Sequence, residues 1–283
     1  MLVVIAVIAI LAGLLLPALS RAKQAAHSAV CRSNVRQLGI ALISYVGDHA
    51  AYPMFIRPRT NAPPDAPAWW FQQLETYSGA TWPATNYLTP RQPVEANTGL
   101  YVCPGYSRLP GVFALSALAS YREQTIPAGS YGYNWTGGSL YRDPLLGLGG
   151  GPARIGRPSV WDVRESEVSN PSGMIALGDA ALLLAPAGES KGKIVGCSNL
   201  AEALWNIPVR IDLGMERPPT LPGDYDSPVV AMRRRHGGRW NIVFCDGHVE
   251  NVRTKALCGR SDDVLKRWNK DNLPHRDLLG SGF

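Results

Sequence analysis

The chain has 283 residues, a net charge of +6 and a sequence in which 46% of the residues are hydrophobic. Its 29 glycines and 23 prolines exceed the average combined usage of about 12%, which disfavours a mainly helical domain and favours short strands joined by long loops. The positive excess is modest and dispersed, so binding of nucleic acid is not expected.

Residues 2–19 read LVVIAVIAILAGLLLPAL and contain no charged or hydrogen-bonding side chain. As a helix this run would be about 27 Å long, close to the hydrocarbon thickness of a bilayer. Pro17 lies near its end, where a membrane helix tolerates the loss of a backbone hydrogen bond. We expect residues 1–20 to cross a membrane. A buried core helix and a cleaved signal peptide are the alternatives, and the second lacks a charged stretch before the run.

The residues after the apolar run have the pattern of an amphipathic helix, with apolar residues spaced by three and four. These residues are Val35, Leu38, Leu42 and Tyr45, with Ile40 and Ile43 beside them. Pro53 limits the helix downstream. We therefore predict one continuous helix of about 45 residues, whose second half (21–50) packs its apolar stripe against a sheet.

Residues 51–283 are expected to form one extracytoplasmic domain rich in strands and loops, so the predicted fold class is α+β. Trp69, Trp70, Phe71 and Trp82 lie in a stretch rich in Pro, Asn and Thr. We interpret these aromatic residues as anchors that pack loops onto the core. A platform that stacks against sugars is the alternative.

Three further segments carry weaker signals. Residues 143–152, DPLLGLGGGP, are predicted to be a flexible turn, because they lack the Lys-Ser/Thr pair of a phosphate loop. Residues 173–179 are predicted to form a short buried strand. The one dense basic cluster is expected to be a solvated loop, with binding of a nucleic acid or acidic polymer as the alternative. It comprises Arg233, Arg234, Arg235 and Arg239.

Residues 239–253, RWNIVFCDGHVENVR, are typical of a β-hairpin. Strands are expected at 241–245 and 248–252. Between them, Asp246 and Gly247 predict a two-residue turn with positive φ at both positions. The Asp-Gly pair is thereby explained by backbone geometry alone.

His236 and His248 are candidates to approach Asp246 at the base of this hairpin, where histidine and carboxylate ligands would suit a metal ion. We favour a structural turn and keep the metal site as the alternative. The sequence has no Gly-x-Ser-x-Gly, no His-Glu-x-x-His and no phosphate loop. No enzymatic activity, catalytic residue or cofactor is therefore predicted. A hydrolase built on these three residues is the least favoured interpretation.

Several short motifs follow one another along the chain. They are Cys31-x-x-Asn34-x-x-Gln37-Leu38-Gly39, Tyr45-x-x-Asp48 with Tyr52-Pro53, Cys103-Pro104, Ser-Tyr-Gly-Tyr-Asn at 130–134, His236 followed after nine residues by Asp246-Gly247, and the ending RWNKDNLPH. With the apolar run, they resemble the type IV pilin-like proteins, the pseudopilins of type II secretion systems. The closer resemblance is to a branch in Planctomycetes and Verrucomicrobia that carries the same His-x9-Asp-Gly motif.

The resemblance implies a pilin-like fold in which a long N-terminal helix packs on a β-rich, loop-rich domain. It implies a single-pass protein of the inner membrane with its C-terminal domain in the periplasm or at the cell surface. The implied role is that of a structural subunit, joined to other pilin-like subunits in a type II secretion or type IV pilus-like filament. A secreted protein or a polysaccharide is the expected cargo or ligand. The alternative is a monomeric, membrane-tethered domain that binds polysaccharide or another polymer.

The five cysteines include no Cys-x-x-Cys pair and no zinc-finger spacing. The resemblance implies a disulfide between Cys31 and Cys103, because both lie in family-like motifs and the bond would tie the helix to the domain. Cys245 lies in a predicted strand and is expected to be a packed thiol. Cys197 and Cys258 are the remaining candidate pair.

One departure from the family pattern concerns the start of the chain. Proteins of this family have a basic leader and a Phe-Thr-Leu-Ile-Glu sequence before the apolar run, where this sequence begins at Met1. We expect either a start that lies further upstream or a copy that is not processed by a prepilin-type peptidase. The basic residues after the run, Arg21 and Lys23, would favour a cytoplasmic domain by the positive-inside rule. An upstream basic leader would remove that conflict.

Overall fold

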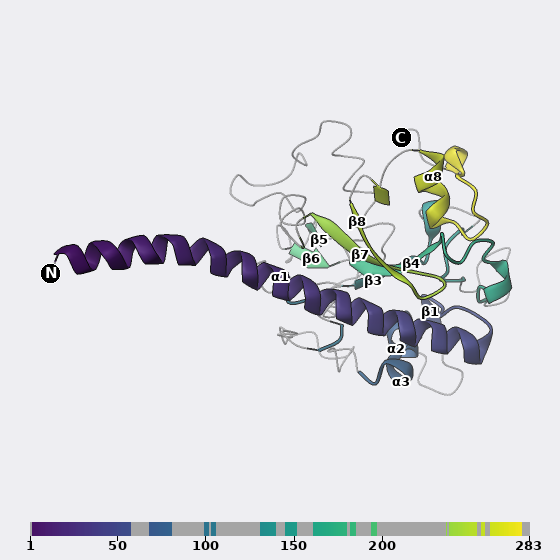
Figure 1. Ribbon diagram of the computed structural model, residues 1–283. Helices are drawn as coiled ribbons and strands as arrows, with labels where there is room; N and C mark the ends of the chain where they lie inside the picture. Colours follow the sequence, from purple (N-terminus) through teal and green to yellow (C-terminus); the bar gives the residue numbers. More distant parts are fainter. Residues whose placement is uncertain are drawn as a thin grey trace.

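The structure is a computed structural model. It describes residues 2–57, 68–80, 99–101, 103–105, 131–139, 145–151, 161–179, 182–184, 194–196, 236, 238–253, 256–257 and 261–278. A long N-terminal helix runs beside and then beyond a domain built on antiparallel strands (Figure 1). The predicted α+β, pilin-like layout is confirmed.

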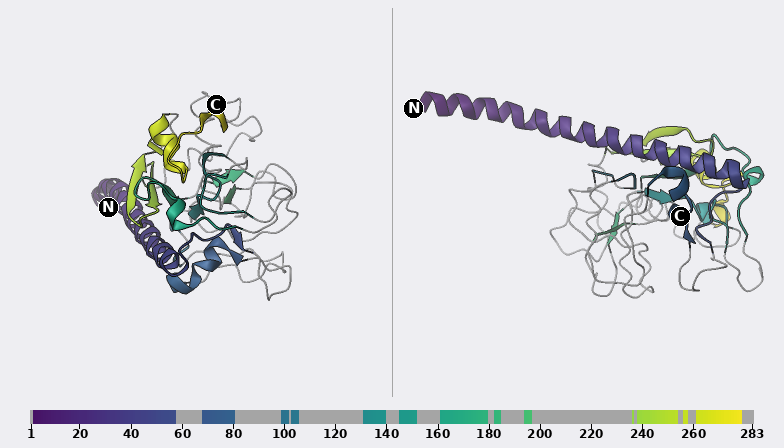
Figure 2. Two further views of the ribbon diagram at one scale, coloured as in Figure 1. Left: turned by 90° about the vertical axis from the view of Figure 1, so that its right-hand side faces the viewer. Right: turned by 90° about the horizontal axis from the view of Figure 1, so that it is seen from below.

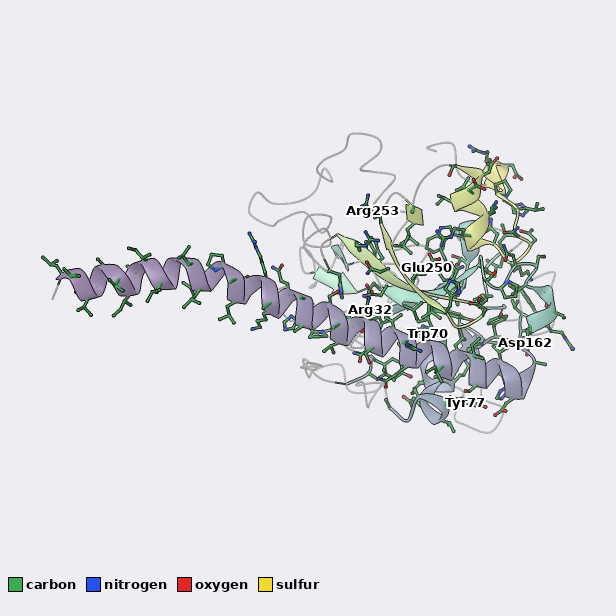
Figure 3. The ribbon with its side chains drawn as sticks, in the orientation of Figure 1. Arg32, Trp70, Tyr77, Asp162, Glu250 and Arg253 are labelled. Carbon is green, nitrogen blue, oxygen red and sulfur yellow. A yellow bond between two sulfur atoms is a disulfide. The ribbon has the colours of Figure 1, made fainter. Side chains whose placement is uncertain are left out.

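Helix α1 extends without interruption from Leu2 to His49. Its first half projects away from the domain, and its side chains face open space on all sides (Figure 3). The large apolar side chains from Leu2 to Leu19 are 50% to 85% exposed. This half is long and apolar enough to cross a membrane, with a mean hydropathy of 3.0, and Pro17 lies within the helix. A buried core helix, one of the two alternatives, is therefore not what the structure contains.

The second half of α1 buries one face, as its spacing of apolar residues predicts. The buried residues are Cys31, Val35, Leu38, Gly39, Ala41, Leu42, Tyr45 and Val46. The helix ends where Ala50 takes a left-handed conformation (φ +50°), and the N–H of Ala50 donates to the carbonyl of Val46 at 2.7 Å. The end therefore falls before Pro53, as expected.

The sheet against which α1 packs has four antiparallel strands in the order β3-β4-β7-β8. Their bounds are β3 Tyr131–Tyr133, β4 Ile175–Asp179, β7 Arg239–Phe244 and β8 Val249–Arg253. β4 is the buried strand predicted at 173–179, and all of its residues are buried. Helix α1 contacts β7, β8 and β4, so it covers one face of the sheet, as the views along and below it also show (Figure 2).

Smaller elements surround this unit. The strands β1 (Ile56–Arg57) and β2 (Ala68–Trp69) pair with each other, as do β5 (Leu182–Leu184) and β6 (Ile194–Gly196). The short helices are α2 (Trp70–Gln73), α3 (Glu75–Ser78) and α8 (Asp262–Leu265). The 3-10 turns are η2 (Gly137–Ser139), η3 (Glu165–Glu167), η5 (Lys266–Trp268) and η6 (Arg276–Leu278).

Two of the aromatic residues singled out in the sequence are core residues. The side chains of Trp70 and Phe71 are buried, and the Trp70 ring stacks on Tyr133 with centroids 5.4 Å apart. The Tyr133 hydroxyl donates to the carbonyl of Pro53 at 2.9 Å. The packing interpretation is confirmed for Trp70 and Phe71, which are thereby removed from any sugar-stacking surface. The side chain of Trp69, and all of Trp82, lie outside the described residues.

The glycine-rich stretch predicted to be a flexible turn is buried where the structure describes it, from residue 145 to residue 151. Its backbone pairs with the segment after β3, because Leu148 donates to Asn134 at 2.8 Å and Gly149 donates to Trp135 at 3.1 Å. A Cβ on Gly147 would lie 2.4 Å from the backbone nitrogen of Gly137. The prediction was wrong because glycine here allows two backbones to approach closely, which composition alone does not distinguish from flexibility.

The predicted hairpin is formed by β7 and β8, but its turn differs from the prediction. Phe244 donates to the carbonyl of His248 at 3.0 Å, and Gly247 donates to the carbonyl of Phe244 at 2.9 Å. The loop therefore comprises Cys245, Asp246 and Gly247. Within it only Gly247 has positive φ (+86°). This is a three-residue loop with a left-handed glycine at its last position, the next most common hairpin after the two-residue turn.

Candidate functional site

The residues of the His-x9-Asp-Gly motif lie at the two ends of β7, and both ends contact α1. His236 precedes the strand and lies beside Ser28 and Cys31. Gly247 follows the strand and lies beside Ile43. The motif thus brackets the part of α1 that packs on the sheet. We treat the His236 end, with its polar and sulfur atoms, as the candidate site.

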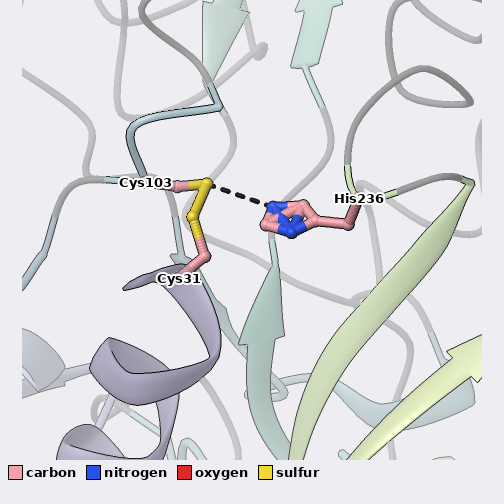
Figure 4. A group of neighbouring side chains, drawn as sticks. All are labelled: Cys31, Cys103 and His236. Atoms are coloured by element: carbon pink, nitrogen blue, oxygen red, sulfur yellow. Dashed lines mark hydrogen bonds between the residues drawn. A yellow bond between two sulfur atoms is a disulfide. The ribbon is translucent and has the colours of Figure 1, made fainter. Parts of the chain in front are cut away.

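A disulfide joins α1 to the domain at this end (Figure 4). Cys31 lies on the buried face of α1, and its sulfur is bonded to that of Cys103 at 2.10 Å, with the two Cα atoms 5.1 Å apart. Both residues are fully buried. This is the pair that the resemblance implies. Pro104 follows Cys103 directly in the sequence.

His236 lies against the disulfide. Its Nε2 is 3.2 Å from Cys103 Sγ, and its Nδ1 is 3.4 Å from Ser28 Oγ and 3.3 Å from Asn241 Nδ2. Since the amide nitrogen of Asn241 is a donor, Nδ1 is the acceptor and the ring proton is on Nε2, directed at the sulfur. The backbone of His236 has φ +51°, which places the ring at the start of β7.

Buried polar residues hold His236 in place. Asp179, at the end of β4, accepts from the backbone N–H of Asn241 at 2.8 Å and from its side-chain amide at 3.1 Å. Asn251 on β8 donates to the carbonyl oxygen of the Asn241 side chain at 2.9 Å. Asp179 and Asn241 are both fully buried. Their hydrogen bonds link three strands of the sheet to the imidazole.

The other end of β7 carries a separate polar group. Asp246 Oδ1 accepts from the backbone N–H of His248 at 3.1 Å and lies 2.5 Å from its Nδ1. The ring of His248 stacks on Phe244 with centroids 4.4 Å apart. Both side chains are more than a third exposed. This cluster stabilises the turn at the protein surface.

The suggested approach of His236 to Asp246 is not what the structure shows. The two residues flank β7, whose six residues separate them by roughly 20 Å at the rise of an extended strand. His236 is therefore too far from Asp246 and His248 to share a metal ion or an active site with them, and both of these alternatives are excluded. The expectation was that His236 and Asp246 meet at the base of the hairpin, whereas the nine residues between them include the whole of β7.

Other motif residues have structural contacts. Asn34 on α1 donates to the carbonyl of Gly99 at 3.5 Å, and Gln37 donates to Ser33 one helical turn earlier at 3.4 Å. In the RWNKDNLPH segment, Asn269 accepts from the N–H of Gly138 at 2.9 Å. Cys245 is a buried free thiol, as predicted, and burial raises its pKa well above the usual value. Cys197 and Cys258 lie outside the described residues, as do Arg233 to Arg235.

The side chain of Asn134, the last residue of the Ser-Tyr-Gly-Tyr-Asn motif, forms hydrogen bonds with three separate segments. Its amide donates to the carbonyls of Ile175 at 2.8 Å and Trp268 at 2.9 Å, and its side-chain oxygen accepts from the N–H of Gly137 at 3.1 Å. The residue is fully buried. It thus joins β4, the C-terminal segment and the turn after β3.

We expect Asn134→Ala to lower the free energy of unfolding by about 3 kcal/mol, because it leaves three buried backbone groups without their partner. Urea unfolding followed by tryptophan fluorescence measures the change. Gln37→Ala is the matched control, since the Gln37 contact is exposed and local, and we expect it to change stability by less than about 0.5 kcal/mol. Equal effects for the two variants would contradict the assigned role.

Comparison with protein-family models, with curated proteins and with solved structures finds no match to this chain. The description of this chain therefore rests on its architecture. What is seen is a long N-terminal apolar helix followed by a β-sheet domain, an arrangement consistent with a pilin-like protein.

Sequence reasoning missed Asp179, Asn241 and Ser28 as parts of this site. Asp179 lies at the end of a predicted buried strand, and a carboxylate there needs a buried partner. This position in the sequence was the signal that could have indicated Asp179 as part of a buried polar site. Asn241 was counted only as a strand residue, and Ser28 only as part of a helical segment. Their convergence depends on strand order, which the sequence pattern does not specify.

Proposed function

We propose that this chain is a pseudopilin-like structural subunit of a type II secretion or type IV pilus-like filament, anchored in the inner membrane by α1. The observation that carries the proposal is the exposed apolar half of α1. Monomeric soluble proteins rarely expose a continuous apolar surface of this size, so lipid or other helices must cover it. The motif resemblance supplies the choice of a pilin-like filament.

The disulfide supports a domain outside the cytoplasm. Disulfides persist in oxidising compartments such as the periplasm and are rare in the cytosol. A buried bond between Cys31 and Cys103 would thus favour the periplasmic orientation. This argument opposes the one from Arg21 and Lys23, and an upstream basic leader would reconcile the two.

The subunit contacts are assigned to the face of α1 that points away from the sheet. Beyond the membrane half, this helix still exposes Val30 and Ile40. In a filament, neighbouring helices would cover these side chains together with the apolar run, through close helix packing. A polysaccharide-binding monomer has less support, because the buried Trp70 and Phe71 cannot stack on a sugar. No catalytic role is assigned.

The proposal is tested by photo-crosslinking in the native host. We expect a photoreactive residue at Leu14 or Ile40 to give a ladder of crosslinked subunits in membranes. The same residue at Arg253, an exposed position on β8, is the control and should give far less. Alkaline extraction should leave the parent chain in the membrane, whereas an Ile8→Asp/Leu11→Asp variant is released, because each buried charge costs about 3 kcal/mol in a bilayer.

A membrane-bound chain that crosslinks to no other subunit would overturn the filament and leave a tethered monomer. A parent chain that alkaline extraction releases would overturn the membrane anchor as well.

A further inference from the structure

Three potential metal-ligand atoms meet where His236 lies against the disulfide. The Sγ atoms of Cys31 and Cys103 and a ring nitrogen of His236 lie within 4.8 Å of one another. While the sulfurs are bonded to each other they offer no thiolate. We propose that, in the dithiol state, Cys31, Cys103 and His236 form a zinc-binding site.

The spacing of these atoms suits zinc. Zinc–sulfur and zinc–nitrogen bonds of about 2.3 Å and 2.0 Å place tetrahedral ligand atoms about 3.5–3.8 Å apart. Nε2 of His236 is already 3.2 Å from Cys103 Sγ. The Cα atoms of the two cysteines are 5.1 Å apart, so side-chain rotation alone can separate the sulfurs to that spacing. No backbone movement is required.

The chemistry of the donor set also favours zinc. Two thiolates and one neutral imidazole bind a divalent ion with no net charge, which suits the buried position of both cysteines. Calcium and magnesium prefer oxygen ligands and are not expected here. His236 is only partly buried, so a fourth ligand from solvent can reach the ion from its side.

The surroundings of His236 can support the metal-bound ring. Nε2 would bind the ion, and the ring proton would move to Nδ1, where Ser28 Oγ at 3.4 Å is an acceptor. Such a contact to the second ring nitrogen fixes the orientation of zinc-bound histidines. The hydrogen bond from the Asn241 amide to Nδ1 would be lost, and that amide would keep its hydrogen bond to Asp179. Asp179 and Asn241 would keep the loop before β7 in place, since their own hydrogen bonds do not involve the sulfurs.

The disulfide and the zinc site exclude each other because they use the same sulfurs. A phosphine reduces the bond by passing two electrons to the sulfurs, becomes its oxide with oxygen from water, and leaves two thiols. Zinc binding then releases both thiol protons. The zinc-loaded chain is thus the form before oxidation or after reduction. Its cysteine sulfurs would be protected from oxidation while the metal is bound.

The test uses the full chain in detergent micelles with Cys197→Ser and Cys258→Ser, so that these thiols do not contribute. One sample is kept oxidised and one is reduced with a phosphine without oxygen. Each is titrated with cobalt(II), whose thiolate charge-transfer and tetrahedral visible bands report the ligands, and zinc is then added to displace it. We expect one ion per reduced chain and none per oxidised chain.

His236→Gln should weaken zinc binding by at least about tenfold in the reduced chain. Loss of even a residue that only contacts a metal ligand lowers metal affinity by about that much. His248→Gln is the matched control, because His248 lies on the turn at the other end of β7, and it should bind within about twofold of the parent. Thermal unfolding of the reduced chain should shift upward with zinc.

Three results would overturn the proposal. They are equal binding by the oxidised and reduced chains, equal binding by the parent and His236→Gln chains, and a reduced chain that binds no zinc. A reduced chain that stays unfolded both with and without zinc counts as the last of these.

Discussion

Replacing both Cys31 and Cys103 by alanine is expected to lower the free energy of unfolding by about 4 kcal/mol. The two residues are 72 positions apart, and a cross-link that closes a loop of this length removes about that much entropy from the unfolded chain. The effect is a large fraction of the 5–15 kcal/mol that stabilise a typical domain. Urea unfolding of the full chain in detergent, followed by tryptophan fluorescence, measures it.

The control for this prediction is Cys245→Ala. Cys245 is buried and forms no disulfide, so its replacement removes no cross-link, leaves a small cavity and costs about 1 kcal/mol. Addition of a reductant should destabilise the parent chain and leave the stability of the double alanine variant unchanged. A double variant as stable as the parent would contradict the role of the disulfide as the covalent tether of α1.

The second large effect is expected at Gly39, where α1 packs closely against the hairpin. A Cβ at this position would lie 3.0 Å from Val243 Cγ1 and 3.2 Å from the carbonyl oxygen of Gly247. Gly39→Leu would therefore push α1 from the sheet and is expected to lower the unfolding free energy by about 3 kcal/mol. The midpoint of urea unfolding reports the change.

Gly47 provides a matched control on the same helix. A Cβ there meets no atom within 4 Å, so Gly47→Leu should stabilise the chain by about 0.5–1 kcal/mol through helix propensity alone. Effects of opposite sign are thus expected for the same substitution eight residues apart. Similar effects would mean that the close contact between α1 and the turn does not determine stability.

Much of the fold follows from local patterns in the sequence. The exposed half of α1 needed only an unbroken apolar run, and its buried half needed only the spacing from Val35 to Tyr45. The hairpin was predictable because Asp246 and Gly247 separate two apolar stretches. These features depend on neighbouring residues, so periodicity and turn chemistry are sufficient.

The candidate site was less predictable because it depends on long-range contacts. His236 meets Ser28 across 208 positions of sequence, and Asp179 meets Asn241 across 62. Such contacts require the strand order β3-β4-β7-β8, which no local pattern gives. The prediction of a flexible turn around Gly147 was wrong for a related reason, since close backbone approach depends on the partner segment. The pairing of Cys31 with Cys103 came from the motif resemblance.

The contacts of α1 with both ends of β7 have a mechanical consequence. Because α1 runs alongside β7, tension applied to the apolar half of α1 loads the interface from Cys31 to Ile43 in shear. Many contacts then resist together and do not break one after another. The disulfide is placed near the point where the helix leaves the domain and is the first bond to take the load. A chain built this way can be pulled by the apolar half of α1 while its domain stays folded.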